Sequence, residues 1–163
     1  MITAVLYLDT SYLLKLYAQE SGSIEVNAWM VGRSEFVCSQ HGRLEVISGL
    51  KRHQREQRID ARGFRQAMHQ FTTDESSGLI VWLPIDDTLI NQACTRVASL
   101  PPSVFLRAAD ALHLTCASDA GLKEIYSHDR HLLAAATHFG LKGVDIINSV
   151  YPIPGLKSPG FDE

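Results

Sequence analysis

The chain has 163 residues, of which 45% are hydrophobic and 20% are charged, a composition that excludes a disordered protein. This length is usual for one domain, and a chain of this length can bury a hydrophobic core without disulfides. The net charge of −3 argues mildly against a protein that binds nucleic acid through phosphate contacts alone, because such proteins are basic, but it allows a metal-dependent nuclease, in which the bound cation reverses the local charge.

The cysteines and the apolar segments restrict where the protein works. Cys38, Cys94 and Cys116 are widely spaced and include no C-x-x-C pair, which indicates neither a zinc ribbon nor a disulfide framework. No apolar run approaches the roughly 18 residues that span a membrane, and the apolar start is too short for a signal peptide. We therefore expect a cytoplasmic protein that does not associate with membranes.

Short apolar runs alternate along the chain with longer segments of helical period. The apolar runs predict five buried strands, at residues 4–8, 35–39, 79–83, 124–127 and 144–147. Steps of three or four predict one apolar face on each of two helices, formed by Leu44, Ile47 and Leu50 and by Leu106, Ala109, Leu112 and Cys116. Helix N-caps are expected at Thr10 or Ser11, at Asp60 and at Asp86 or Asp87.

Strands that alternate with helices predict a mostly parallel sheet with helices on both faces. We expect residues 1–150 to form this α/β domain and residues 151–163, which are rich in proline and glycine, to form a flexible tail. In such sheets ligands bind beyond the carboxyl ends of the strands, where the strand order reverses. Acidic residues at strand ends are therefore the first candidates for a functional site.

Two aspartates lie at predicted strand ends. Asp9 follows the first apolar run and precedes Thr10 and Ser11, and Asp129 follows the fourth run and Ser127. If the strands are parallel, both carboxylates point out of the same edge of the sheet. Each aspartate can also be explained as the N-cap of the helix that follows it, and the sequence leaves both interpretations open.

Two further acids lie in apolar helical segments. Asp110 and Glu45 have neighbours that belong to the predicted core. A carboxylate in such surroundings loses hydration, which raises its pKa unless a cation lies beside it. That cation is either Arg107 or Arg43 in a salt bridge, or a divalent metal ion shared by several carboxylates.

Four segments carry these acids: Leu8-Asp9-Thr10-Ser11 with Leu14-Lys15-Leu16-Tyr17, Leu44-Glu45-Val46-Ile47-Ser48, Ala109-Asp110-Ala111-Leu112-His113-Leu114, and Ser127-His128-Asp129. Together they resemble the four signatures of PIN-domain ribonucleases, with VapC-type toxins as the most similar group. Order and spacing match across about residues 3–147. The last segment reads Ser-His-Asp where many relatives have Thr-x-Asp, and this difference retains the hydroxyl.

The resemblance implies a three-layer α/β/α domain with a mostly parallel five-stranded sheet. It also implies a catalytic pocket that binds Mg²⁺ or Mn²⁺, formed by Asp9, Glu45, Asp110 and Asp129 and ordered by the hydroxyl of Thr10 or Ser11. The implied function is that of a ribonuclease toxin with an RNA substrate. Family members usually form homodimers, and a cognate antitoxin protein covers their pocket.

Metal-dependent hydrolysis of a phosphodiester at this pocket predicts products with a 5′-phosphate and a 3′-hydroxyl. Lys15 and Arg107 lie near the acids in the sequence and are the predicted phosphate contacts. A basic run follows the Glu45 helix and is interpreted either as a solvated helix end or as a surface for RNA or a partner. It comprises Lys51, Arg52, His53, Arg55, Arg58, Arg62 and Arg65.

Other functions remain open. A metal-independent ribonuclease would use paired histidines as acid and base, and His113, His128 and His131 lie near the acids in the sequence, although His113 in an apolar helix is typical of a core residue. A PIN-like domain kept for protein binding would tend to lose acids, and all four are present. An aspartyl phosphatase needs a second acid where this chain has Ser11. The remaining histidines are expected at the surface: His41, His53, His69 and His138.

Overall fold

The computed structural model of the protein describes residues 5–148. The expected tail at 151–163 and the end of the predicted domain at residue 150 lie outside the described residues. Five short strands occur: β1 (Leu6–Tyr7), β2 (Phe36–Ser39), β3 (Ile80–Leu83), β4 (Glu124–Tyr126) and β5 (Lys142–Val144). Four of the five predicted strands therefore lie within one or two residues of their expected positions.

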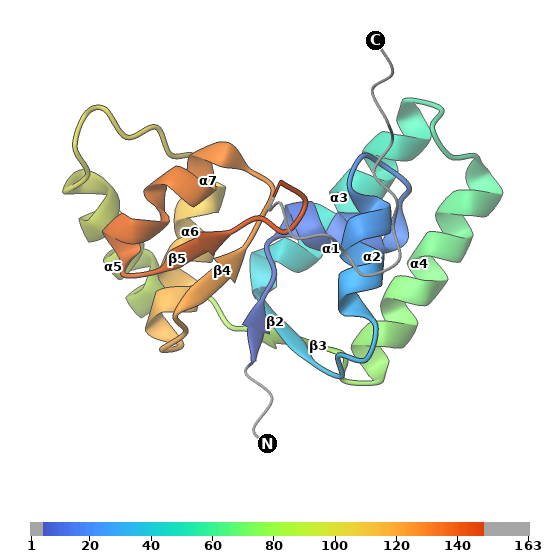
Figure 1. Ribbon diagram of the computed structural model, residues 1–163, viewed down its shortest axis with the longest axis horizontal. Helices are drawn as coiled ribbons and strands as arrows, with labels where there is room; N and C mark the ends of the chain where they lie inside the picture. The colour runs from blue at the N-terminus through green and yellow to red at the C-terminus, as the bar shows by residue number, and fades with distance from the viewer. Residues whose placement is uncertain (1–4, 149–163) are drawn as a thin grey trace, which may run out of the picture.

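The strands form two parallel groups that meet in the middle of the molecule. β1, β2 and β3 are hydrogen-bonded in that order, and β4 pairs with β5. The groups join where Leu8 bridges to Tyr126 in parallel and the backbone N–H of Asp9 donates to the Tyr126 carbonyl at 3.0 Å. The strand order is thus β3-β2-β1-β4-β5, which confirms the predicted parallel sheet (Figure 1).

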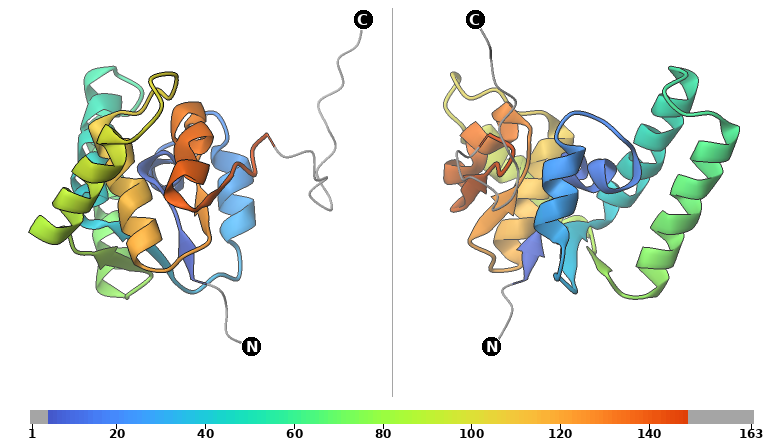
Figure 2. Two further views of the ribbon diagram at one scale, coloured as in Figure 1. Left: turned by 90° about the vertical axis from the view of Figure 1, so that its left-hand side faces the viewer. Right: turned by 45° about the vertical axis from the view of Figure 1, so that its right-hand side comes forward.

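Helices lie between the strands: α1 (Thr10–Tyr17), α2 (Ser23–Met30), α3 (Gln40–Arg55), α4 (Ala61–Ser76), α5 (Asp87–Ala98), α6 (Ala108–Asp119), α7 (Arg130–Ala135) and the 3-10 helix η1 (Ala136–Phe139). They pack in two groups, α1–α4 and α5–η1, on either side of the sheet, as the α/β/α prediction requires (Figure 1). The long helices α3 and α4 pack along each other at one side of the molecule (Figure 2).

Aspartates begin several of these helices. Asp60 and Asp86 accept hydrogen bonds from the backbone N–H groups of Gly63 and Leu89 at 2.7 and 2.9 Å, which confirms both predicted N-caps. The expected N-cap of the first helix at Thr10 or Ser11 is wrong by one residue. Asp9 has the extended backbone and accepts from the N–H of Tyr12, so it is itself the cap.

Two details of the predicted elements are wrong. Leu44 is 67% exposed, because α3 turns a different face to the core, with Val46 and Leu50 fully buried. Gly49 lies on this face and lets α3 approach α1 closely, since a Cβ there would lie 2.8 Å from a methyl group of Leu14. The fifth strand ends at Val144, three residues earlier than expected, because the following residues form a turn.

The core occupies the space between the sheet and both helix layers. Its largest fully buried side chains include Tyr7, Tyr12, Phe36 and Phe71. The strand residues Leu8 and Ile125 join it from the two sides of the central junction, so one core continues through the whole sheet. Across residues 5–148, no helix combines the length and apolar character needed to cross a membrane.

Candidate functional site

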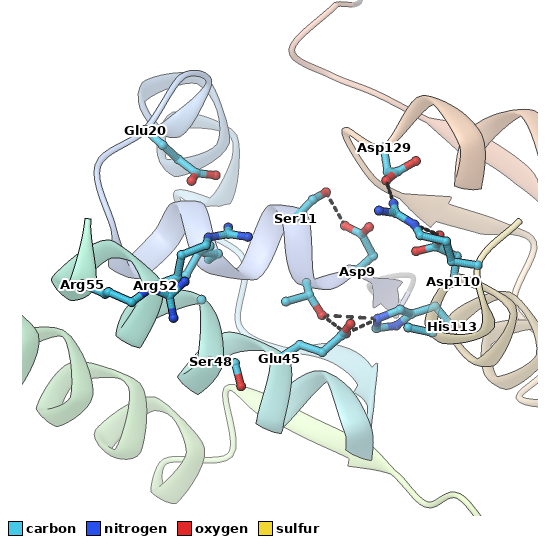
Figure 3. A pocket seen from close by; sticks show the side chains of 15 residues that line it. Asp9, Ser11, Glu20, Glu45, Ser48, Arg52, Arg55, Asp110, His113 and Asp129 are labelled. Carbon is cyan, nitrogen blue, oxygen red and sulfur yellow. Dashed lines mark hydrogen bonds and ion pairs between the residues drawn. The ribbon is translucent and has the colours of Figure 1, made fainter. Parts of the chain in front are cut away.

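A cavity of about 650 Å³ opens beyond the carboxyl ends of β1 and β4. These strands are neighbours, and the connections that follow them run toward opposite edges of the sheet, which is the position at which parallel α/β sheets bind ligands. The cavity brings together all four predicted acids and three other predicted site residues (Figure 3). They are Asp9, Glu45, Asp110, Asp129, Thr10, Ser11 and Arg107.

Asp9 lies at the base of the cavity and is only 4% exposed. Its carboxylate accepts hydrogen bonds from the hydroxyls of Ser11 at 2.6 Å and Ser127 at 2.7 Å (Figure 3 shows the Ser11 contact). Burial raises the pKa of this carboxyl, and the charge of His113 together with the two hydroxyls only partly opposes the effect. Asp9 is therefore a buried acid held by neutral donors, a setting that favours a nearby cation.

The same hydroxyls connect Asp9 to the end of β4. Ser127 Oγ also accepts from the backbone N–H of Asp129 at 2.9 Å, and Ser11 Oγ accepts from the backbone N–H of His128 at 2.9 Å. The hydroxyl of Ser11, one of the two candidates beside the first acid, therefore joins Asp9 to the residues that follow β4. Ser127 was quoted as part of a motif, but its bond to Asp9 joins residues 118 positions apart and could not be predicted from local spacing.

Asp110 and Asp129 share a single cation, Arg107. The guanidinium donates through Nε to Asp110 at 2.9 Å and through Nη2 to Asp129. Burial acts to raise the pKa of Asp129, but the backbone N–H groups of Leu132 and His131 and the charge of Arg107 lower it below the ordinary value. Asp129 is thus both the N-cap of α7 and a residue of the cavity, so the two interpretations of its position hold together.

The predicted salt bridge to an arginine occurs for Asp110 with Arg107, but no predicted arginine pairs with Glu45. Arg43 binds Glu75 at 2.5 Å on the outer face of α3 and does not contact Glu45. Since the Arg107 side chain is 57% exposed, its movement away from the two aspartates disturbs little packing. The pair of carboxylates can therefore exchange the guanidinium for another cation.

Glu45 has a different partner, His113. His113 Nε2 lies 2.8 Å from Glu45 Oε2, and Thr10 Oγ1 donates to the same oxygen at 2.6 Å. The buried His113 ring also lies 2.9 Å through Nδ1 from the Tyr7 hydroxyl, which confirms it as a core histidine with satisfied nitrogens. The expectation that His41 is a surface residue is wrong, because its ring lies against His113 with 4.3 Å between centroids.

Burial alone would keep both His113 and Glu45 neutral, but their contacts outweigh it. Interactions with Cys38, Glu45 and Asp9 raise the pKa of His113 to about 10. The His113 contact, with the Thr10 hydroxyl, lowers the pKa of Glu45 to about 2. Both groups are therefore charged near neutral pH. Burial and the neighbouring His113 charge lower the pKa of His41 to about 4, so this ring is neutral.

The basic side chains are arranged differently from the prediction. Lys15 is 6% exposed and pairs with Glu20 at 2.7 Å, and it does not line the cavity. Arg52 and Arg55 line it instead, at the end remote from Asp110 and Asp129 (Figure 3). Both belong to the predicted basic run, whose helical spacing was the available signal for them. His53, in the same run, was expected at the surface but is fully buried beside Glu20.

The side chains around the cavity suit a hard divalent cation, because Asp9, Asp110 and Asp129 all offer carboxylate oxygens to it. Within residues 5–148, however, the ligand atoms that come within 4.8 Å of one another belong to His41, Glu45 and His113. Asp110 and Asp129 are held by Arg107, whose guanidinium lies where a shared cation is required. Carboxylates are ligands of the type that Mg²⁺ or Mn²⁺ prefers, but joint binding of one ion by Asp9, Asp110 and Asp129 would require Arg107 to leave and the carboxylates to move closer together.

The Glu45–His113 pair predicts how stability depends on pH. The raised pKa of His113 contributes stability below about pH 6.5 that is lost as the pH rises toward 10. The lowered pKa of Glu45 contributes stability above about pH 4.5 that is lost as the pH falls toward 2. In EDTA, the free energy of unfolding of the wild type, measured in urea, should fall by about 1–3 kcal/mol between about pH 6 and pH 9. The loss should be smaller in Glu45→Gln and unchanged in Glu35→Gln, an exposed control.

An equal loss in Glu45→Gln and the wild type would contradict the pairing, because removal of the carboxylate must lower the pKa of His113.

The comparisons with known proteins agree with this architecture. The chain resembles VapC20 of Mycobacterium tuberculosis, a toxin that cleaves the sarcin–ricin loop, with a TM-score of 0.63 and 18% identity over 80% of this chain and 94% of that one. PAE2754 of Pyrobaculum aerophilum gives a TM-score of 0.57 and 21% identity over 86% and 83% of the two chains. A search of curated proteins finds no significant match. The PIN domain model matches residues 6–137, and the chain therefore belongs to the PIN-domain family.

Proposed function

We propose that this protein is an endoribonuclease that hydrolyses RNA phosphodiester bonds with Mg²⁺ or Mn²⁺ and leaves 5′-phosphate and 3′-hydroxyl ends. The observation that carries the proposal is the state of Asp9. It is a buried carboxylate held by two hydroxyls, and it lines the same cavity as two aspartates that already share one cation. Membership of the PIN-domain family supports the same chemistry.

Asp9, Asp110 and Asp129 are the proposed metal ligands, with Glu45 as a fourth acid at the other side of the cavity. A divalent cation bound there would lower the pKa of a bound water and bind a phosphate oxygen. The protein's own contribution is orientation. Ser11 and Ser127 fix both oxygens of Asp9, and the helix N-terminus that Asp129 caps fixes the second acid.

Arginines supply the proposed grip on the substrate. Arg107, released from the aspartates, remains beside them and can bind the phosphate that is cleaved, because a guanidinium matches phosphate oxygens in pairs. Arg52 and Arg55 at the far end of the cavity are proposed to hold neighbouring phosphates. Lys15 is no longer part of the proposal, since it does not line the cavity and its ammonium is engaged by Glu20.

The biological role that we propose is that of a toxin controlled by a protein antitoxin in the cytoplasm. The fold similarity to VapC20, which is described as a toxin that cleaves the sarcin–ricin loop, supports a structured RNA as the target class. A cationic side chain of the antitoxin could replace the metal between the carboxylates, as Arg107 does here. We propose a homodimer, as is usual for relatives of this type.

The alternatives are less consistent with the contacts. A histidine-based ribonuclease needs a free imidazole, but His113 is 2% exposed and bonded at both nitrogens, and His128 pairs with Asp145 at 2.9 Å. A module kept only for protein binding does not need Asp9 to be buried without a cation. Sensitivity to a chelator separates the first alternative from the proposal, and the variants below separate the second.

Cleavage of total RNA by the purified protein should require Mg²⁺ or Mn²⁺ and stop in EDTA. Asp9→Asn and Asp110→Asn should each lower the rate at least about 100-fold, because loss of a ligand costs more than loss of the groups that orient ligands. Asp9→Asn should also unfold at the same or a higher urea concentration, since it removes a buried charge. Asp87→Asn, an exposed aspartate on α5, is the matched control.

Cleavage that continues in EDTA would transfer the chemistry to the histidines. Full activity in either aspartate variant would contradict the metal-ligand assignment.

Arg55→Gln should weaken RNA binding and make its salt dependence shallower. Loss of one phosphate contact to a single-stranded loop lowers the slope of log affinity against log salt by about 0.7. Binding of a labelled RNA hairpin, measured in EDTA at several salt concentrations, separates this effect from cleavage. Arg65→Gln on α4 is exposed and does not line the cavity, so its slope should equal that of the wild type. Equal slopes for all three proteins would exclude Arg55 from the RNA path.

A further inference from the structure

We infer that His41, Glu45 and His113 form a binding site for a divalent transition metal ion, distinct from the aspartate site proposed above. His41 and Glu45 lie one turn apart on α3, and His113 reaches them from α6. One ligand atom from each of the three side chains lies within 4.8 Å of the other two. The inference concerns metal binding alone and does not rest on the proposed nuclease activity.

The distances fit such an ion. Nε2 of His41 lies 3.4 Å from Glu45 Oε2, and Nε2 of His113 lies 2.8 Å from the same oxygen. Metal–nitrogen and metal–oxygen bonds of about 2.1 Å in a tetrahedral arrangement place neighbouring ligand atoms about 3.4 Å apart. A small outward movement of the Glu45 carboxylate, which is one third exposed, completes this spacing.

A second and independent observation is the state of His41. Its Nε2 atom is buried and has no hydrogen-bond partner of good geometry; Glu45 Oε2 lies 3.4 Å away, and the ring also interacts with the backbone of Ala109. Among residues 5–148 the only other buried side-chain polar atom in this state is Nδ1 of His53. Buried polar atoms are normally paired, and this one faces the other two ligands.

The surrounding contacts orient the three side chains as metal ligands usually are oriented. Both histidines turn Nε2 toward Glu45 and Nδ1 toward one hydroxyl, Ser39 Oγ, at 2.8 Å for His41 and 3.2 Å for His113. Thr10 holds the carboxylate of Glu45 at 2.6 Å. Partners on the far side of ligating imidazoles and carboxylates are typical of metal sites, because they fix the tautomer and the ring.

Metal binding would replace the ion pair between Glu45 and a protonated His113, because Nε2 of His113 must release its proton to bind an ion. That ion pair explains only part of the arrangement. It accounts for their 2.8 Å contact but leaves His41 Nε2 without a function. Two imidazoles and one carboxylate are ligands that select Zn²⁺, Co²⁺ or Ni²⁺ over Mg²⁺ and Ca²⁺. The inferred site should therefore differ from the aspartate site in the metal that it takes.

Titration of the full-length, metal-stripped protein with Co²⁺ tests the inference. Visible d–d absorption should appear without the thiolate-to-cobalt band, which distinguishes histidine ligands from the cysteines. An excess of Mg²⁺ should not remove this signal. His41→Asn should weaken the binding at least about tenfold, since even outer partners of a ligand contribute that much. His69→Asn, an exposed histidine on α4, should bind as the wild type does.

Zn²⁺ binding followed by NMR of the histidine ring nitrogens provides a second readout in the same proteins. Two rings should shift in the wild type, and neither in His41→Asn. Asp9→Asn should retain the His41-dependent signal, so a failure of the nuclease proposal would leave this test intact. Equal Co²⁺ affinity in His41→Asn and the wild type, a thiolate band, or the absence of Co²⁺ binding would each overturn the inference.

Discussion

The junction between β1 and β4 is the contact on which the site depends. These strands are joined by one bridge, Leu8 to Tyr126, and by the hydrogen bond from Asp9 N to the Tyr126 carbonyl. Immediately beyond it, the hydroxyl of Ser127 bonds to the carboxylate of Asp9. The place where the two halves of the sheet meet is therefore also the place where the first acid is fixed, and a shift of register there would separate Asp9 from Asp129.

Around this junction the protein uses its own cations to balance its acids. Arg107 neutralises Asp110 and Asp129 from the solvent side, while protonated His113 neutralises Glu45 from the core side. The two arrangements differ in how easily they change. Arg107 is exposed and can move, whereas His113 is enclosed and bonded at both nitrogens. Arg107 can therefore leave its aspartates with little repacking, whereas a change of partner at His113 requires the Glu45 carboxylate to move.

The positions of Asp9 and Asp129 could be predicted from the sequence, because residues within a few positions after a buried parallel strand lie at the edge of the sheet. Asp110 was identified by its apolar surroundings, and its pairing with Arg107 follows from a spacing of three residues in and before α6. Local order and composition were sufficient in these cases.

Contacts between distant segments could not be predicted in this way. Glu45 and His113 are 68 residues apart, and nothing in either helix specifies the other as partner. Lys15 was predicted because it lies close to Asp9 in the sequence, but its position on α1 directs it to Glu20. Arg52 and Arg55 reach the cavity instead, from the far end of α3. His53 is buried because it packs against Glu20, and its place in a run of basic residues gave no indication of this burial.

An anomalous difference map of crystals soaked in Mn²⁺ would test the aspartate site most directly. The account predicts a peak within coordination distance of Asp9, Asp110 and Asp129, with the guanidinium of Arg107 displaced from both aspartates. Crystals that show no Mn²⁺ among these three carboxylates, with Arg107 still bonded to Asp110 and Asp129 at saturating Mn²⁺, would contradict it.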